Sequence, residues 1–170
     1  MGRNDRFISL LQLDELLYSA FTESDDPLFG LHVGADNHYG NLDLLGNLMA
    51  TADALEQGLA MLFRYKDLVV PYLAFTLETL GNDVMLAVAS KDPSLRFTAT
   101  RTHNEVVVAT LVASGRSLLG GNMPVSAAWF LHGGPVADQV AVYQQFFRCP
   151  LHFTQQYNAI TIPASLLAEP

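Results

Sequence analysis

The stretch Tyr143–Pro163 constrains the fold more than any other, because it holds the end of a helix, a stop and two short strands. Apolar residues before the stop recur at the three-and-four spacing of a buried helix face, at Val140, Tyr143, Phe146 and Phe147. Pro150 ends this helix, since a proline disfavours the α conformation in the preceding residue. The spacing then becomes that of strands over Leu151–Thr154 and Ile160–Ile162, with a turn at Tyr157-Asn158. A helix and a hairpin form no core alone, so the sequence predicts an α+β domain with further layers.

Periodicity predicts three more helices, at Phe7–Phe21, Thr51–Tyr65 and Thr102–Leu119, besides the last one, which begins at Pro135. The third contains a valine-rich run with strand propensity. Thr102 and Glu105 fit a capping box, however, and together with the length of the segment this favours a helix.

Strands are predicted at Tyr72–Leu80 and Val84–Ala89, around a tight Gly81-Asn82 turn, and at Val125–His132. Leu95–Thr100 is expected to add a short extended piece, and Asp36–Asn47 reads as loop because it is rich in Asn, Gly and Asp. Phe29–Gly34 fits either an extended segment or a tight helical turn. The expected fold is a mainly antiparallel sheet of hairpins packed with about four helices.

Composition excludes several classes of protein. Half of the 170 residues are apolar, which argues against disorder, and no apolar run approaches the roughly 20 residues that cross a bilayer. Seventeen acidic against nine basic residues give a net charge of −8, so this chain by itself is not expected to bind nucleic acid. Cys149 is the single cysteine, which excludes an internal disulfide and indicates a reducing, cytoplasmic location.

The chain contains no strong catalytic, cofactor-binding or metal-binding motif. The glycine pairs form neither a P-loop nor a dinucleotide fingerprint, and no nucleophile elbow occurs. Cys149 follows an arginine that could activate a thiol, yet a lone cysteine beside a strand is more often packing. A set of His132, Asp138 and Cys149 has no supporting spacing. We therefore expect no catalytic residues, no metal site and no cofactor.

The order and spacing of several short motifs resemble one family, the N-terminal effector-binding ("arabinose-binding" type) domain of AraC-type transcriptional regulators. The resemblance covers roughly Phe7–Leu167 and is carried by Asp26–Gly34, Gly40, Leu45–Leu48, Leu55, Leu59, Arg64-Tyr65, Pro135, Tyr143, Phe147–Phe153 and Asn158–Ile160. It implies one regulatory domain over residues 1–170 that senses a small molecule. It also implies a C-terminal helix-turn-helix domain in the full-length protein, through which alone DNA would be bound, and a homodimer. A sugar is not implied as the effector.

A free-standing small α+β enzyme or ligand carrier is the alternative. The expected dimer would use the apolar stripe of the Phe7–Phe21 or the Thr102–Leu119 helix.

The expected strands have one bulky face, predicted to pack on helices, and one small-residue face, on which we place the effector. The strand Val125–His132 is apolar on both faces and is predicted to be central, with Trp129 on one side and Phe130 and His132 on the other. These three residues either reach the effector or only fill the core. His132 is the preferred polar contact, and Arg64 and Tyr65 are a second choice, although a helix cap and a packed aromatic explain that pair more simply.

Overall fold

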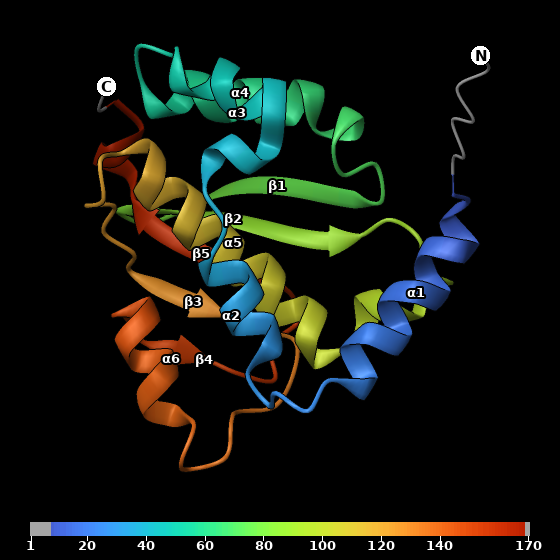
Figure 1. The fold of residues 1–170 in the computed structure, drawn as a ribbon. Coiled ribbons are helices and arrows are strands. Elements are labelled where there is room, and N and C mark those ends of the chain that lie inside the picture. Colours follow the sequence, from blue (N-terminus) through green and yellow to red (C-terminus); the bar gives the residue numbers. More distant parts are fainter. Residues whose placement is uncertain (1–7, 169–170) are drawn as a thin grey trace, which may run out of the picture.

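A five-stranded sheet in the order β1-β2-β5-β3-β4 organises the structure, a computed structural model that describes residues 8–168 (Figure 1). Neighbouring strands are antiparallel except β3 and β4, which are parallel. The strands are β1 Leu73–Leu80, β2 Asp83–Ser90, β3 Ala127–Trp129, β4 Leu151–His152 and β5 Asn158–Pro163. The predicted α+β class with a mainly antiparallel sheet is therefore confirmed.

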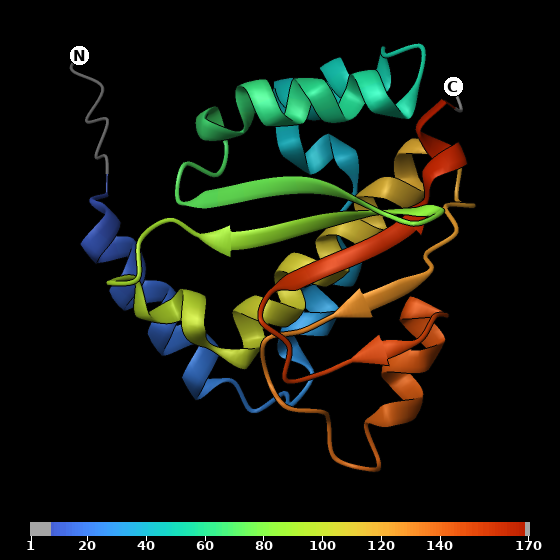
Figure 2. The same ribbon diagram turned by 180° about the vertical axis from the view of Figure 1, so that it is seen from behind.

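Six α-helices accompany the sheet within the described residues, somewhat more than the four expected. They are α1 Leu10–Glu23, α2 Phe29–Ala35, α3 Asp43–Ala50, α4 Leu55–Tyr65, α5 Arg101–Leu118 and α6 Val140–Phe147. The long helix α5 crosses one face of the sheet, α2 packs on the outer side of α5, and α3 and α4 lie beyond β1 (Figure 1). Seen from behind, no described helix crosses the other face (Figure 2). The helical layer is thus one-sided.

The first hairpin forms as predicted. β1 pairs with β2 from Leu73 opposite Ser90 to Leu80 opposite Asp83, and Gly81 in the turn has a φ of 61°. Glycine adopts this left-handed conformation without the steric cost of a side chain.

The predicted hairpin between Leu151–Thr154 and Ile160–Ile162 is wrong. β5 lies between β2 and β3, and β4 instead runs parallel to β3, where the amide of Phe130 donates to the carbonyl of His152 at 2.8 Å. The rings of Phe130 and Phe153 stack at 5.0 Å between centroids and hold the two segments together. The alternation of apolar and polar residues identified the strands but not the strands they pair with. The prediction that Val125–His132 contributes an interior strand is confirmed, although β3 covers only three of these residues.

Two predicted non-helical segments are helical. Asp36–Asn47 contains a 3₁₀ turn at Tyr39–Leu42 and the start of α3, and Leu95–Thr100 contains a 3₁₀ turn at Arg96–Ala99. A Cβ on Gly46 would lie 1.7 Å from the carbonyl oxygen of Tyr39, so this glycine permits a close approach that its loop-like composition concealed. The helix expected from Thr51 begins only at Leu55, because Thr51 ends α3.

The helix expected from Phe7 is α1, which begins at Leu10; Phe7 itself lies outside the described residues. α5 is confirmed as a helix, but its cap is different from the predicted one. The hydroxyl of Thr100 accepts from the amide of His103 at 3.1 Å, whereas Thr102 donates to the carbonyl of Phe21. Glu105 is thereby free for another role.

The segment that the sequence left open, Phe29–Gly34, is helix α2, and its glycines explain its close packing on α5. A Cβ on Gly34 would lie 2.5 Å from the Cβ of Ala109, and one on Gly30 would lie 2.3 Å from the carbonyl oxygen of Thr102. Both contacts are shorter than real Cβ atoms tolerate. The two helices can therefore approach this closely only with glycine at both positions.

Candidate functional site

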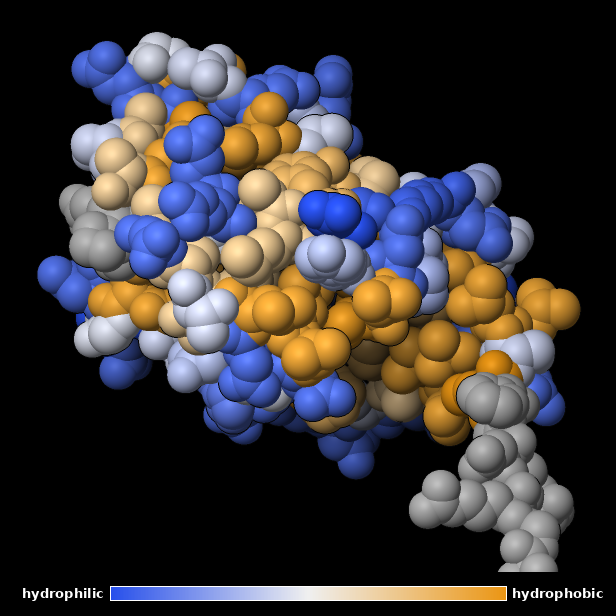
Figure 3. Space-filling model, turned by 90° about the horizontal axis from the view of Figure 1, so that it is seen from above, coloured by the Kyte–Doolittle hydropathy of each residue, from blue (hydrophilic) through white to orange (hydrophobic). Residues whose placement is uncertain are grey.

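An apolar cavity of about 190 Å³ lies between α5, the pair α3 and α4, and the sheet. Seen from above, apolar residues gather around a hollow on this side of the molecule (Figure 3). Its wall consists mainly of aliphatic side chains, including Leu45, Met49, Leu55, Leu59, Leu62, Leu73, Phe75, Leu86, Val107, Leu111, Leu118, Met123, Ile160 and Ile162. Such a concave, largely preformed apolar space is the usual form of a small-molecule site.

Helical and strand periodicity position this wall. α4 presents Leu55, Leu59 and Leu62 at helical spacing, and β1 presents Leu73, Phe75 and Leu77 on alternate positions of one face. The bulky face of the sheet does pack on helices, as predicted, but it leaves this cavity between them. The sequence placed the effector on the opposite, small-residue face instead.

No described residue that lines the cavity carries a charge, and its side-chain hydrogen-bonding groups belong to Tyr72, Thr110 and Ser114. The hydroxyl of Thr110 accepts from the side-chain amide of Asn37 at 2.9 Å. Burial raises the pKa of Tyr72, so its phenol is neutral. The Ser114 hydroxyl oxygen is buried and has no hydrogen-bond partner among the described residues. The cavity therefore favours apolar ligands that form very few hydrogen bonds with its wall.

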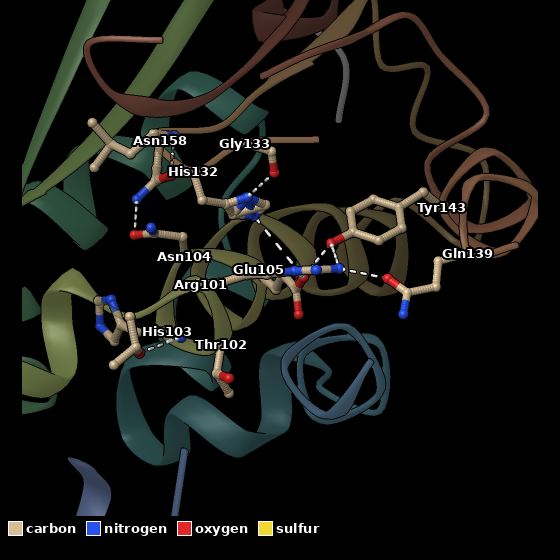
Figure 4. Close-up of polar contacts among 12 residues, drawn as sticks. Arg101, Thr102, His103, Asn104, Glu105, His132, Gly133, Gln139, Tyr143 and Asn158 are labelled. Carbon is tan, nitrogen blue, oxygen red and sulfur yellow. Dashed lines mark hydrogen bonds and ion pairs between the residues drawn. The ribbon is translucent and has the colours of Figure 1, made fainter. Parts of the chain in front are cut away.

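A second buried site of opposite character surrounds Glu105, near the start of α5 (Figure 4). Glu105 is 1% exposed. Its Oε1 accepts from Arg101 Nε at 2.6 Å and from the hydroxyl of Tyr143. Arg101 also donates to Gln139 Oε1 at 2.9 Å. The cluster joins α5 to α6, because a buried charge is tolerated only when it is paired and hydrogen-bonded.

His132 lies at the edge of this cluster. Its side chain is 8% exposed, its ring stacks on those of Phe130 and Phe153, and its Nε2 is 4.0 Å from Glu105 Oε1. Burial, together with the positive charge of Arg101, lowers the pKa of His132 to about 4. Burial, followed by the hydrogen bond to Glu105, raises the pKa of Tyr143. Both rings are therefore neutral at pH 7.

The five residues singled out from the sequence lie in three different places, and none lines the apolar cavity. Phe130 and His132 stack together beside Glu105. Trp129 is on the opposite side of the sheet, as predicted, where it stacks on His152 at 4.3 Å. Arg64 is exposed, with its guanidinium 5.3 Å from the ring centre of Tyr65. A contact between these residues and an effector stays a prediction.

Sequence reasoning missed the role of Glu105 because the capping-box pattern accounted for it. A better signal was present: Arg101 and Glu105 lie four residues apart, so a helix places them as an ion pair, and Glu105 directly precedes the apolar run Val106–Val108. Asn104 was missed for the same reason, and its side chain accepts from Asn158 at 2.8 Å.

Other kinds of site find little support between residues 8 and 168. No three potential metal ligands cluster there, and no helix is long and apolar enough to span a bilayer. Burial raises the pKa of Cys149 to about 11, against the opposing influence of Arg116, so the thiol is a packing group rather than a nucleophile.

The arabinose-binding domain of AraC transcription regulators, N-terminal, matches residues 1–170. The chain belongs to this family. The resemblance inferred from the short motifs is confirmed, and with it the assignment as a ligand-sensing regulatory domain.

A solved structure, the transcriptional regulator CdpR from Pseudomonas aeruginosa, shares the fold of this AraC-type domain with a TM-score of 0.66 at 16% sequence identity. The similarity covers 96% of the present chain and 58% of the CdpR chain. The chain therefore spans somewhat more than half the length of that regulator. A comparison with curated proteins found no match.

Proposed function

We propose that this AraC-type domain binds an uncharged, predominantly apolar small molecule in the cavity between α3, α4, α5 and the sheet. The observation that carries the proposal is the cavity wall itself, which has about 190 Å³ of space and no charged side chain among the described residues that form it. A dry apolar cavity of about 150 Å³ in another protein binds benzene, so the space is sufficient for a ligand of that size.

Sugars and charged metabolites fit this wall poorly. A sugar would bring several hydroxyls into a space where only Tyr72, Thr110 and Ser114 offer hydrogen bonds, and each unpaired hydroxyl costs free energy on burial. A carboxylate or ammonium group would be buried without a counter-charge. We therefore infer an apolar effector in spite of the sugar in the name of the family.

The effector state is proposed to act on an attached helix-turn-helix domain that follows residue 170 in the full-length, cytoplasmic protein. Membership in the family supports this arrangement. The net charge of −8 leaves DNA binding to that other domain. We propose no catalytic role, since the described residues that line the cavity include no nucleophile paired with a base.

A homodimer through α1 is the second proposal. Leu11 is 73% and Leu16 62% exposed on this helix, and the one residue of α1 that is fully buried is Asp14. Exposed apolar residues concentrated on one helix mark interfaces, and a second copy of the chain offers the same helix. Sedimentation should show a dimer that Leu11→Lys with Leu16→Lys converts to monomer. Leu68→Lys, at an 81% exposed position outside α1, should leave it dimeric. A monomeric unmodified chain at all concentrations would overturn this proposal.

Toluene tests the proposed cavity directly. At ten times its dissociation constant it should raise the free energy of unfolding by about 1.4 kcal/mol, which is a rise of a few degrees in Tm. Leu111→Phe places extra volume in the cavity and should abolish this rise, whereas Leu131→Phe, at an exposed position, should preserve it. Equal rises in both variants, or none in the unmodified chain, would refute the cavity as the binding site.

A further inference from the structure

We propose that the Ser114 hydroxyl is the polar anchor of the cavity, and that the effector is an apolar molecule with a single uncharged hydrogen-bonding group, a hydroxyl or a carbonyl. This inference rests on the proposed function and specifies the class of ligand more narrowly.

The state of the Ser114 side chain carries the inference. Ser114 is 8% exposed, its Oγ is buried, and the oxygen has no hydrogen-bond partner among the described residues. Buried polar groups in folded proteins are nearly always paired, and one left unpaired calls for an explanation. A serine inside a helix commonly satisfies itself by donating to the carbonyl four residues earlier, but Ser114 makes no such bond to residue 110.

The unpaired hydroxyl also lies where a ligand can reach it, because Ser114 is part of the cavity wall. The aliphatic wall residues on α5, among them Val107, Leu111 and Leu118, cannot hydrogen-bond to it, and no bond joins it to Thr110. A ligand group that donates to or accepts from Ser114 Oγ would remove the cost of the unpaired oxygen, and a purely apolar ligand would leave that cost in place.

The surroundings of Ser114 allow the polar group of the ligand one or two hydrogen bonds, with Ser114 and Thr110. Thr110 lies one helical turn earlier in the same wall, and its hydroxyl, which accepts from Asn37, still has a proton to donate. On the other side, Met123 fills the space beside Gly115, because a Cβ on Gly115 would lie 2.4 Å from the sulfur of Met123. This end of the cavity therefore combines a hydroxyl pair with an apolar cap.

Toluene and p-cresol, which differ by one hydroxyl, separate the anchor from the cavity. In the unmodified chain, the affinity for p-cresol should be within a few-fold of that for toluene. The Ser114 hydroxyl replaces the hydrogen bond to water that the p-cresol hydroxyl loses on binding. Ser114→Ala should weaken p-cresol at least about tenfold and leave toluene unchanged or tighter. Ser117→Ala, on the same helix but outside the cavity wall, is the matched control and should change neither affinity.

The possible outcomes distinguish the two proposals. Toluene binding combined with a p-cresol affinity that Ser114→Ala does not lower would overturn the anchor and leave the cavity proposal standing. Absence of toluene binding to the unmodified chain would overturn both. Alanine is the better helix former, so Ser114→Ala is expected to fold, and its melting curve checks this.

Discussion

The two ends of helix α5 border buried regions of opposite chemistry. Near its start, Arg101 and Glu105 lie in a fully paired polar cluster with Tyr143. From Val107 to Leu118 the same helix lines an apolar cavity without charged side chains among the described residues. In the first region the carboxylate, guanidinium and phenol groups are paired with one another, although the neighbouring His103 and His132 have buried ring nitrogens without a partner among the described residues. The second region has space and the buried, unpaired hydroxyl of Ser114.

This difference shows how one helix serves both stability and binding. The buried Glu105 carboxylate and the half-buried Arg101 fix the position of α5 against α6 through Tyr143 and Gln139, because removing Arg101 would leave a buried charge unpaired. The cavity has the opposite property: its aliphatic wall tolerates changes in shape, and a ligand can supply the contacts that are missing. We expect substitutions in the two regions to separate stability from binding.

The largest effect should come from Glu105→Ala. It leaves the half-buried Arg101 guanidinium without its carboxylate and the Tyr143 hydroxyl without its acceptor, so the free energy of unfolding should fall by about 2–4 kcal/mol. Urea denaturation measures the loss, and toluene should still bind at low temperature, where the variant remains folded. Glu105→Gln keeps a hydrogen-bond acceptor and should lower the free energy of unfolding by less. A loss below about 1 kcal/mol in Glu105→Ala would show that the cluster contributes little.

The second-largest effect should be a loss of stability at low pH that originates near the start of α5. The pKa values of His103 and His132 are lowered from 6.5 to about 4, mainly by burial, so the unfolded chain binds more protons than the folded chain between these values. The free energy of unfolding therefore decreases as the pH falls from 6.5 to 4, by about 3 kcal/mol for each histidine.

Denaturation curves of His103→Asn and His132→Asn at several pH values measure this contribution. Each variant should show a shallower loss of stability across that window than the unmodified chain. Parallel pH profiles for the unmodified chain and both variants would contradict the assignment.

The smallest effect on stability is expected in the cavity wall. Leu111→Met conserves volume and should cost less than about 1.5 kcal/mol, because the neighbouring side chains can repack into the available space. Toluene affinity should change by only a few-fold. A loss of stability as large as that of Glu105→Ala would mean that the wall is as tightly constrained as the cluster, and that the contrast between the two regions is wrong.

The sequence predicted those parts of this fold that depend on local periodicity. The β1-β2 hairpin follows from alternation on either side of Gly81-Asn82, and α5 follows from its length and polar start. The partner of β4 was not predictable, because it depends on the stacking of Phe130 on Phe153, which lie on either side of α6 in the chain. α3 was missed because Gly46, which local composition assigns to a loop, is required by a long-range contact with Tyr39.

The site was less predictable than the fold. A cavity is a property of three layers together, so the leucines that line it look like ordinary core residues in the sequence. Ser114 has no distinguishing neighbours along the chain, and among the buried groups without a partner only its place in the cavity wall singles it out. His132 was chosen as a polar residue after an aromatic strand, and its burial beside Glu105 became visible only once α5 and α6 were placed.

The central claim is that the apolar cavity, rather than the polar cluster, receives the effector. Methyl-resolved NMR with p-cresol as the probe tests it most directly, because both regions contain separate reporters. The account predicts contacts from the p-cresol ring to the methyl groups of Leu59, Leu111 and Ile160, with the rings of Phe130 and Tyr143 undisturbed. Contacts to Phe130, His132 or Tyr143 without any to the three aliphatic residues would contradict it.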